Sequence, residues 1–293
     1  MAGVPVLEAE EAGPTALRML LGTRLRRLRE GRGVTREEAA GVIGASPSKI
    51  SRMELGRHGF KPRNVTDLLD LYGVDDPAER EALLTLVEQA AAPGWWQPYG
   101  DVVPPWFEPY LGMEQSAAVI RTYEVQFVPG LLQTPGYARA VIRLGSEDPP
   151  PEEVERRVAL RMRRARILHR RAGAPRLWAV IDEGALRRAV CDPPTMREQI
   201  DHLIEMSRAA HVNVQVLPFS AGGHPAAGGP ICILRFAQRE LPDMVYLEQL
   251  SSARYPANES ELTRYRHIMD RLVVQAAPPD ETTALLHRIR ARL

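Results

Sequence analysis

Three side chains on one expected helix carry the groups that recognise DNA bases. Ser48, Lys49 and Arg52 share the outward face of a short helical segment, residues 46–52. Arginine forms a two-point hydrogen-bond pair with the O6 and N7 atoms of guanine, and serine or lysine reaches base edges and phosphates. The spacing therefore predicts that these three side chains read base pairs in a DNA major groove.

Further polar residues around the same helix are suited to hold the DNA backbone. We expect phosphate contacts from two arginines, a serine and a lysine, namely Arg36, Ser46, Arg57 and Lys61. The N-termini of two short helices add backbone N–H donors and a positive dipole end. Contacts of this kind fix the position and register of a protein on the duplex.

The surrounding sequence predicts that residues 34–56 form two short helices joined by a tight turn. Thr35 is a suitable N-cap for the first helix, and Glu38 three positions later completes a capping box. Ser46 caps the second helix, with Pro47 in the first helical position, where a missing N–H costs nothing. A glycine ends each of the two helices. Two helices with this connection are typical of a helix-turn-helix unit.

Apolar residues at helical spacing predict the inward face of this unit. The inward set is Ala39, Val42, Ile50, Met53 and Leu55. We expect Ala40 or Gly41 to be the small residue that lets the two helices approach. An ordinary helical bundle with a solvated polar face is the alternative, and the two caps with the local charge favour DNA binding.

Positive charge is concentrated around this unit. The whole chain has a net charge of +1, whereas residues 15–72 hold 12 basic and 6 acidic side chains, a net charge of +6 that leaves −5 for the remainder. Helical patterns across residues 15–92 predict an all-α, five-helix DNA-binding domain. Residues 1–14 are acidic and contain proline and glycine, and we expect a disordered tail.

The segment Leu25–Val74 resembles the Xre and phage-repressor family of helix-turn-helix domains. In that family Glu54 usually has a structural role, and the residue after the capping threonine, here Arg36, commonly contacts DNA. The sequence departs from the family at Leu55, where asparagine is frequent, and in the long loop of residues 57–62. The segments that carry the resemblance are Arg24-Leu25-Arg26-Arg27-Leu28-Arg29 and Ile50-Ser51-Arg52-Met53-Glu54-Leu55-Gly56.

The second half of the chain has the patterns of an α+β domain. Strand patterns, rich in β-branched residues, occur at 176–181, 212–217, 231–236 and 244–248. Helical patterns occur at 113–123, 135–144, 152–171, 195–209, 259–276 and 280–292. We expect a small, mostly antiparallel sheet backed by helices in a sensing or assembly domain, residues 113–293. Residues 93–112, rich in proline and aromatic residues, are expected to form an ordered connector.

This half resembles the C-terminal domain of a large group of actinobacterial Xre regulators, sometimes called antitoxin-like. The segments that carry the resemblance are 127–138, 161–164, 214–219 and 245–248. The family assigns no chemistry to this domain. Its genes often neighbour one for a very small protein, so the resemblance implies a small protein partner.

Enzymatic and metal chemistry find little support in the sequence. None of the seven histidines pairs with a second ligand at metal spacing, so we expect no metal site. Asp182 and Glu183 could act as general acid and base, but a cap between a strand and a helix explains them better. No nucleotide-binding or nucleophile motif occurs, so we expect no catalytic residue, no cofactor and no enzyme activity. The aromatic residues of 95–107 fit a core or, less often, a ligand pocket.

The composition favours a cytoplasmic protein. The first residues lack a basic region followed by an apolar one, so we expect no signal peptide, and no apolar run is long enough for a membrane span. Cys191 and Cys232 are far apart in the sequence and are expected to be free thiols.

These patterns together predict a sequence-specific transcriptional regulator that binds double-stranded DNA as a homodimer on an inverted repeat. Its C-terminal domain would respond to a small protein partner or to a small-molecule ligand. The alternative is an antitoxin-like protein that sequesters a small partner protein and uses DNA binding to regulate its own gene.

Overall fold

The computed structural model describes residues 13–145, 148–226 and 228–293. These residues form two compact units. Unit 1 contains the described residues up to Gln97 together with Leu111–Ser116 and Phe236–Pro242, and unit 2 contains the rest. The expected tail, residues 1–14, lies outside the described residues except for Gly13 and Pro14, and Pro14 begins the first helix.

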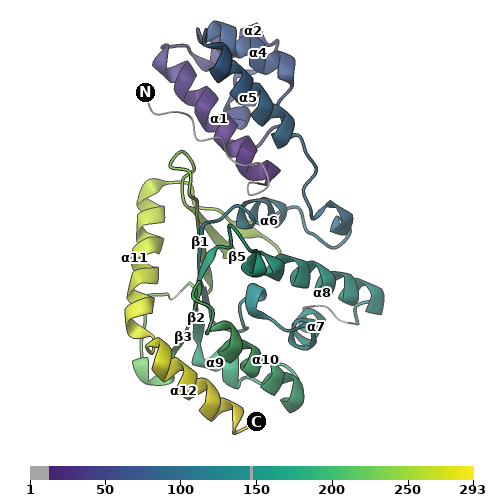
Figure 1. Ribbon diagram of the computed structural model, residues 1–293, viewed down its shortest axis with the longest axis vertical. Coiled ribbons are helices and arrows are strands. Elements are labelled where there is room, and N and C mark those ends of the chain that lie inside the picture. The colour runs from purple at the N-terminus through teal and green to yellow at the C-terminus, as the bar shows by residue number, and fades with distance from the viewer. Residues whose placement is uncertain (1–12, 146–147, 227) are drawn as a thin grey trace. The chain divides into compact units, whose positions relative to one another are not determined.

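Five consecutive helices build unit 1, as the sequence predicts (Figure 1). Four of them have a proline in the first turn, where the missing N–H leaves no helical hydrogen bond unmade. The helices are α1 (Pro14–Gly31), α2 (Arg36–Val42), α3 (Pro47–Glu54), α4 (Pro62–Leu71) and α5 (Pro77–Ala90).

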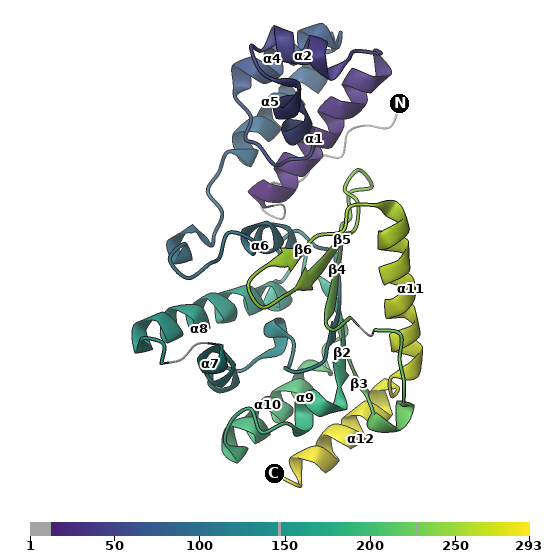
Figure 2. The same cartoon turned by 180° about the vertical axis from the view of Figure 1, so that it is seen from behind.

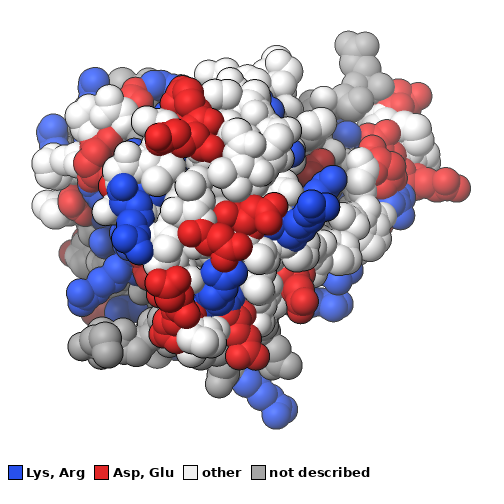
Figure 3. All heavy atoms as spheres, turned by 90° about the horizontal axis from the view of Figure 1, so that it is seen from above, with Lys and Arg blue, Asp and Glu red and all other residues white. Residues whose placement is uncertain are grey.

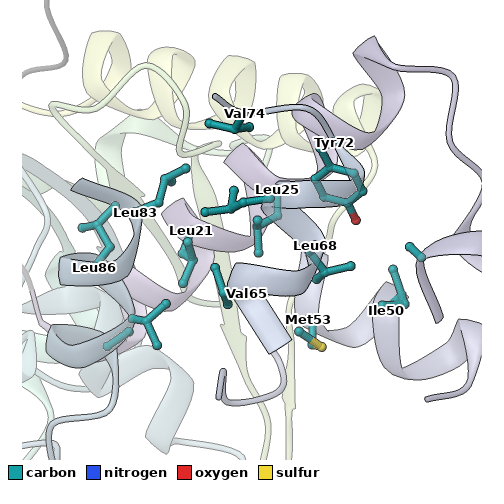
Figure 4. Packing of buried hydrophobic residues seen from close by; sticks show 14 of the residues in the cluster. Leu21, Leu25, Ile50, Met53, Val65, Leu68, Tyr72, Val74, Leu83 and Leu86 are labelled. Atoms are coloured by element: carbon teal, nitrogen blue, oxygen red, sulfur yellow. The ribbon is translucent and has the colours of Figure 1, made fainter. Parts of the chain in front are cut away.

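An apolar core holds these helices together (Figure 4). Leu21 and Leu25 of α1 pack against Val65 and Leu68 of α4, and all four side chains are at most 2% exposed. Met53 joins the same cluster from α3. Burial of each such side chain contributes about 1.5–3 kcal/mol, so the core fixes which face of α3 turns inward.

The closest approach in this unit occurs at a glycine of α1. A Cβ atom on Gly22 would lie 2.4 Å from the carbonyl oxygen of Met53 and 2.7 Å from that of Glu54. Between α2 and α3 the small residue is alanine, because Ala40 is buried whereas a Cβ on Gly41 would meet open space. Two backbones therefore touch where α1 crosses the end of α3.

Unit 2 is organised around a mixed sheet in the order β3-β2-β1-β4-β5-β6. The strands are β1 (Val119–Glu124), β2 (Arg176–Asp182), β3 (Val212–Leu217), β4 (Ile231–Arg235), β5 (Met244–Glu248) and β6 (Ala253–Arg254). Strands β1, β2 and β3 are parallel, and the other pairings are antiparallel. Because β4 runs opposite to both of its neighbours, β1 and β5 point the same way and end at the same edge.

Helices cover both faces of this sheet (Figures 1 and 2). One face carries α7, α8, α9 and α10, and the other carries α11, while α12 packs beside the edge strand β3. Their bounds are α7 (Pro135–Leu144), α8 (Pro151–Ala165), α9 (Glu183–Arg187), α10 (Pro193–Met206), α11 (Glu259–Gln275) and α12 (Pro279–Arg290). The remaining elements are α6 (Glu108–Glu114) and the short 3-10 helices η1 (Gln97–Tyr99), η2 (Gly130–Leu132), η3 (Arg166–His169) and η4 (Phe219–Ala221).

The α+β class is confirmed, but the helix predicted at residues 113–123 is wrong. Helix α6 ends at Glu114, and the following residues form β1, which pairs with β2 on one side and β4 on the other. A central strand is covered on both faces, so its sequence lacks the strict alternation of apolar and polar residues that marks a half-exposed strand. Its short apolar run cannot be distinguished from a buried helix by periodicity alone.

Because of the close approach at Gly22, alanine at this position is expected to change stability in the opposite direction to alanine at Gly41. Gly22→Ala is expected to destabilise the protein by about 1–3 kcal/mol, because the new methyl group overlaps two backbone carbonyls. The matched control Gly41→Ala lies at an open helical position and should raise stability by up to about 1 kcal/mol. Chemical denaturation followed by circular dichroism measures both, and a Gly22→Ala protein as stable as the wild type would contradict the contact.

Candidate DNA-binding site

The first helix of the pair begins with a complete capping box. The Thr35 hydroxyl accepts the Glu38 N–H at 3.2 Å, and the Glu38 carboxylate accepts the Thr35 N–H at 2.7 Å. The Thr35 hydroxyl also donates to the Glu38 carboxylate at 2.8 Å, and the bonds that this carboxylate accepts from the Thr35 N–H and hydroxyl hold the pKa of Glu38 below its ordinary value. The predicted start of α2 is therefore confirmed in detail.

The turn between α2 and α3 and the start of α3 also agree with the prediction from the sequence. Gly44 adopts a φ of 59° and Gly56, just beyond α3, a φ of 67°, a region that glycine enters without strain. The Ser46 hydroxyl accepts the N–H of Lys49 at 3.3 Å and so caps α3. The capped N-terminus and the glycine after the C-terminus limit α3 to two turns.

The outward face of α3 carries the three predicted base readers. Ser48 and Arg52 are exposed and Lys49 is half-buried, whereas Ile50 and Met53 of the same helix are 2% exposed. Among the described residues, none forms a hydrogen bond or ion pair with the side chain of Ser48, Lys49 or Arg52. Their donors are therefore available to a ligand outside the chain.

The residues predicted to contact phosphates lie before and after α3 in the sequence. Arg36 opens α2 and is half-buried, with its Nε 3.4 Å from Glu54 Oε2. Ser46 is exposed, and its capping hydroxyl accepts a bond while its own hydrogen can still be donated. Arg57 and Lys61 are exposed in the loop after α3. This loop is anchored by a neighbouring aromatic ring, Phe60, which packs against the core.

A buried ion pair fixes the end of α3 to α1. Arg29 and Glu54 are each 6% exposed. The Arg29 Nε donates to Glu54 Oε1 at 2.5 Å and its Nη2 donates to Oε2 at 3.1 Å, a two-point pairing. Its Nη1 donates to the carbonyl of Val34 at 2.9 Å, just before α2. The hydrogen bond to Glu54 raises the pKa of Arg29.

Sequence reasoning missed the Arg29 side of this pair. The structural role that the resemblance implied for Glu54 agrees with its burial. The only signal for Arg29 in the sequence is its position, because it continues the four-residue spacing of Leu17, Leu21 and Leu25 on the buried face of α1. An arginine in an apolar register signals a buried partner.

Two residues predicted to face inward are exposed. Val42 is 46% exposed and Leu55 is 45% exposed. Val42 is the last residue of α2, and Leu55 is the C-cap of α3, where the backbone is already leaving the helix. The helical spacing that places Ala39, Ile50 and Met53 in the core does not extend to these ends.

Charge is mixed on the end of the molecule that Figure 3 presents. Basic and acidic side chains are interspersed there among uncharged residues. This face therefore carries no uniform basic patch.

Loss of the Glu54 carboxylate is expected to destabilise the site strongly. Glu54→Gln leaves the buried Arg29 charge with only the half-exposed Glu30, 3.3 Å from its Nη2, as a counter-ion and should cost about 3–5 kcal/mol of unfolding free energy. Glu37→Gln, an exposed glutamate of α2, is the control and should cost less than about 1 kcal/mol. Denaturation midpoints give both values, and equal losses for the two variants would contradict the role of the pair.

The described part of the chain contains neither a membrane-spanning helix nor a cluster of metal-ligating side chains. Its helices include none with the length and apolar character that crossing a membrane requires. Across residues 13–145, 148–226 and 228–293, no group of three histidine, cysteine or acidic side chains is arranged to hold a metal ion.

Two models of known protein families match separate parts of the chain. A family model described as a helix-turn-helix domain matches residues 20–83, which include α2 and α3. A model described as a domain of unknown function, DUF5753, matches residues 107–288, more than half of the chain. No curated protein and no solved structure matches the sequence. The chain belongs to the DUF5753 family and carries a helix-turn-helix domain, a DNA-binding module, before that domain.

Proposed function

We propose that this protein is a sequence-specific DNA-binding regulator of transcription whose base-reading element is α3. One observation carries the proposal. In α3 the apolar side chains are buried, and the side chains of the outward Ser48, Lys49 and Arg52 form no hydrogen bond or ion pair with the described residues. The match to a helix-turn-helix domain over the same residues supports it.

Each outward residue has a distinct part in the proposed complex. Arg52 pairs with guanine O6 and N7 from the major groove, and Lys49 and Ser48 contact neighbouring base edges. Arg36, Ser46, Arg57 and Lys61 hold phosphates on either side, which sets the angle at which α3 enters the groove. The N-termini of α2 and α3 add backbone donors for the same phosphates.

A homodimer on an inverted repeat is part of the proposal. A single recognition module of this size buries only about 600–1,000 Å² against DNA, and a two-fold pair doubles that contact. The half-sites would lie about one helical turn, ~34 Å, apart. We assign the dimer contact to the C-terminal part, residues 95–293, which would also couple a small-molecule ligand or a small protein to operator affinity.

Arg52→Ala is expected to remove base discrimination without unfolding the protein. Loss of a two-point guanine contact costs about 1–3 kcal/mol of discrimination, roughly tenfold to a hundredfold in relative affinity. Fluorescence anisotropy on the best-bound duplex and on the same duplex with one guanine replaced measures the ratio. An unchanged ratio would show that Arg52 does not contribute to base discrimination.

Lys61→Ala is the matched phosphate variant. It should weaken binding to all duplexes by a similar factor and reduce the slope of log affinity against log salt by about 1, because one fewer counterion is released. The discrimination ratio should stay at the wild-type value. A salt slope equal to that of the wild type would contradict the phosphate contact.

The dimer predicts a dependence on the second half-site. Sedimentation of the full chain should give twice the mass of one chain, and a duplex with one half-site scrambled should bind at least tenfold more weakly than the intact repeat. Equal affinity for one and two half-sites, with a sedimenting monomer, would show that the reader acts alone.

A further inference from the structure

Strand β3 forms one outer edge of the sheet in unit 2. It pairs with β2 on one side and with no strand on the other. The two strands are parallel with Val212 opposite Leu177, and the Leu177 N–H donates to the carbonyl of His211. The bonds to β2 therefore come from alternate residues of β3. The N–H and C=O groups of Val212, Val214 and Val216 point away from β2.

The two ends of this outer edge are paired within the chain, and its middle is not. The Val212 N–H donates to a carbonyl of the preceding turn at 2.9 Å. The Val216 N–H donates to Thr282 Oγ1 at 3.1 Å, and the Val216 carbonyl accepts the Ala277 N–H at 2.9 Å. None of the described residues bonds to the Val212 carbonyl or to either backbone group of Val214. One donor and two acceptors of the edge thus have no partner in the described chain.

A cavity of about 400 Å³ borders this unpaired stretch. Val212 and Val214 line it from β3. Asp280, Thr283 and His287 line it from α12, where spacings of three and four residues place them on one side of the helix. The volume is within the range of about 300–1,000 Å³ that is common for small-ligand sites. The cavity therefore separates the unpaired strand edge from the side of a helix.

The unpaired backbone groups are withdrawn from bulk water. Val214 is 2% exposed, and Val212 is 4% exposed. Buried backbone N–H and C=O groups are paired in the great majority of cases, because an unmade hydrogen bond in the interior is costly. A ligand in the cavity that offers both a donor and acceptors would supply the missing partners.

Two charges of opposite sign also line the cavity. Arg208 lies in the turn between α10 and β3, beside the start of the strand. Asp280 lies in the first turn of α12, two residues before the Thr282 that bonds Val216 near the end of the strand. In the described part of the chain no hydrogen bond or ion pair involves the side chain of Arg208 or of Asp280. A cation therefore lies toward one end of the unpaired edge and an anion toward the other.

The pattern of donors and acceptors matches an extended peptide. In antiparallel pairing, two facing residues exchange both of their backbone hydrogen bonds. A peptide that runs opposite to β3 can make this exchange with Val214, and its residue two places further on can donate to the Val212 carbonyl. This direction brings the peptide C-terminus toward Arg208 and its N-terminus toward Asp280. Because α12 forms the opposite wall, the edge admits a single chain and not the sheet of another domain.

We propose that this cavity binds a free peptide of about three residues, extended along β3, with its carboxylate on Arg208 and its ammonium group on Asp280. Peptides that add a strand to a sheet edge gain their affinity from main-chain hydrogen bonds. Guanidinium and carboxylate add a charge-assisted contact at one end. The binding goes beyond DNA recognition and does not depend on it, although such a ligand would fit the proposed response of this domain.

Amide NMR spectra of the isotope-labelled full-length protein test the proposal, with tripeptides added in pools sorted by central residue. At least one pool should shift the Val214 amide signal, and a tripeptide from it should bind with a Kd below about 1 mM. Its N-acetyl and C-terminal amide derivatives should each bind at least tenfold more weakly. No shift with any pool would overturn the proposal. So would an acetylated peptide that binds as tightly as its parent, because the ligand would then be a segment of a longer chain.

Methylation of single peptide nitrogens separates strand pairing from other modes of binding. In the proposed pairing, the N–H of the third residue donates to the Val212 carbonyl, and the N–H of the second residue points away from β3. N-methylation at the third residue should therefore weaken binding at least tenfold, whereas N-methylation at the second should change it by less than about threefold. Equal effects of the two methyl groups would contradict pairing along the edge.

Single substitutions locate the two ends of the peptide. Arg208→Gln and Asp280→Asn should each weaken binding of the same tripeptide at least tenfold, and both residues are exposed, so the fold should be kept. The exposed controls Arg271→Gln in α11 and Glu281→Gln beside Asp280 should not change it. Wild-type affinity in both cavity variants would overturn the assignment. DNA affinity measured without peptide reports on the regulator function separately.

Discussion

The buried pair of Arg29 and Glu54 is the interaction that holds α3, the proposed base-reading helix, in place. Both side chains are withdrawn from water, so their attraction stabilises the fold only when the two-point geometry is kept. That geometry ties the last residue of α3 to α1, and the third Arg29 bond ties the approach to α2. A shift of α3 relative to α1 would break the pair, so the pair holds the end of α3 in position.

Local features were predictable from the sequence, and long-range ones were not. The Thr35 and Glu38 capping box involves residues three apart, and both hydrogen bonds are present as predicted. The partners Arg29 and Glu54 are 25 residues apart, and no local pattern connects them. The local pattern predicts a helix where β1 lies, because the strands that pair with it, β2 and β4, are far along the chain. The exposed Leu55 shows that periodicity fails at helix ends, where the backbone changes direction.

One measurement tests both the base-reading role proposed for α3 and the proposed dimer. Full-length protein can be used to select ligands from a library of random-sequence DNA, and the recovered duplexes can be sequenced. The account predicts an enriched inverted repeat with guanine at a fixed position in each half-site and half-site centres about one helical turn apart. Recovery of sequences with no common motif would contradict the claim that α3 reads bases.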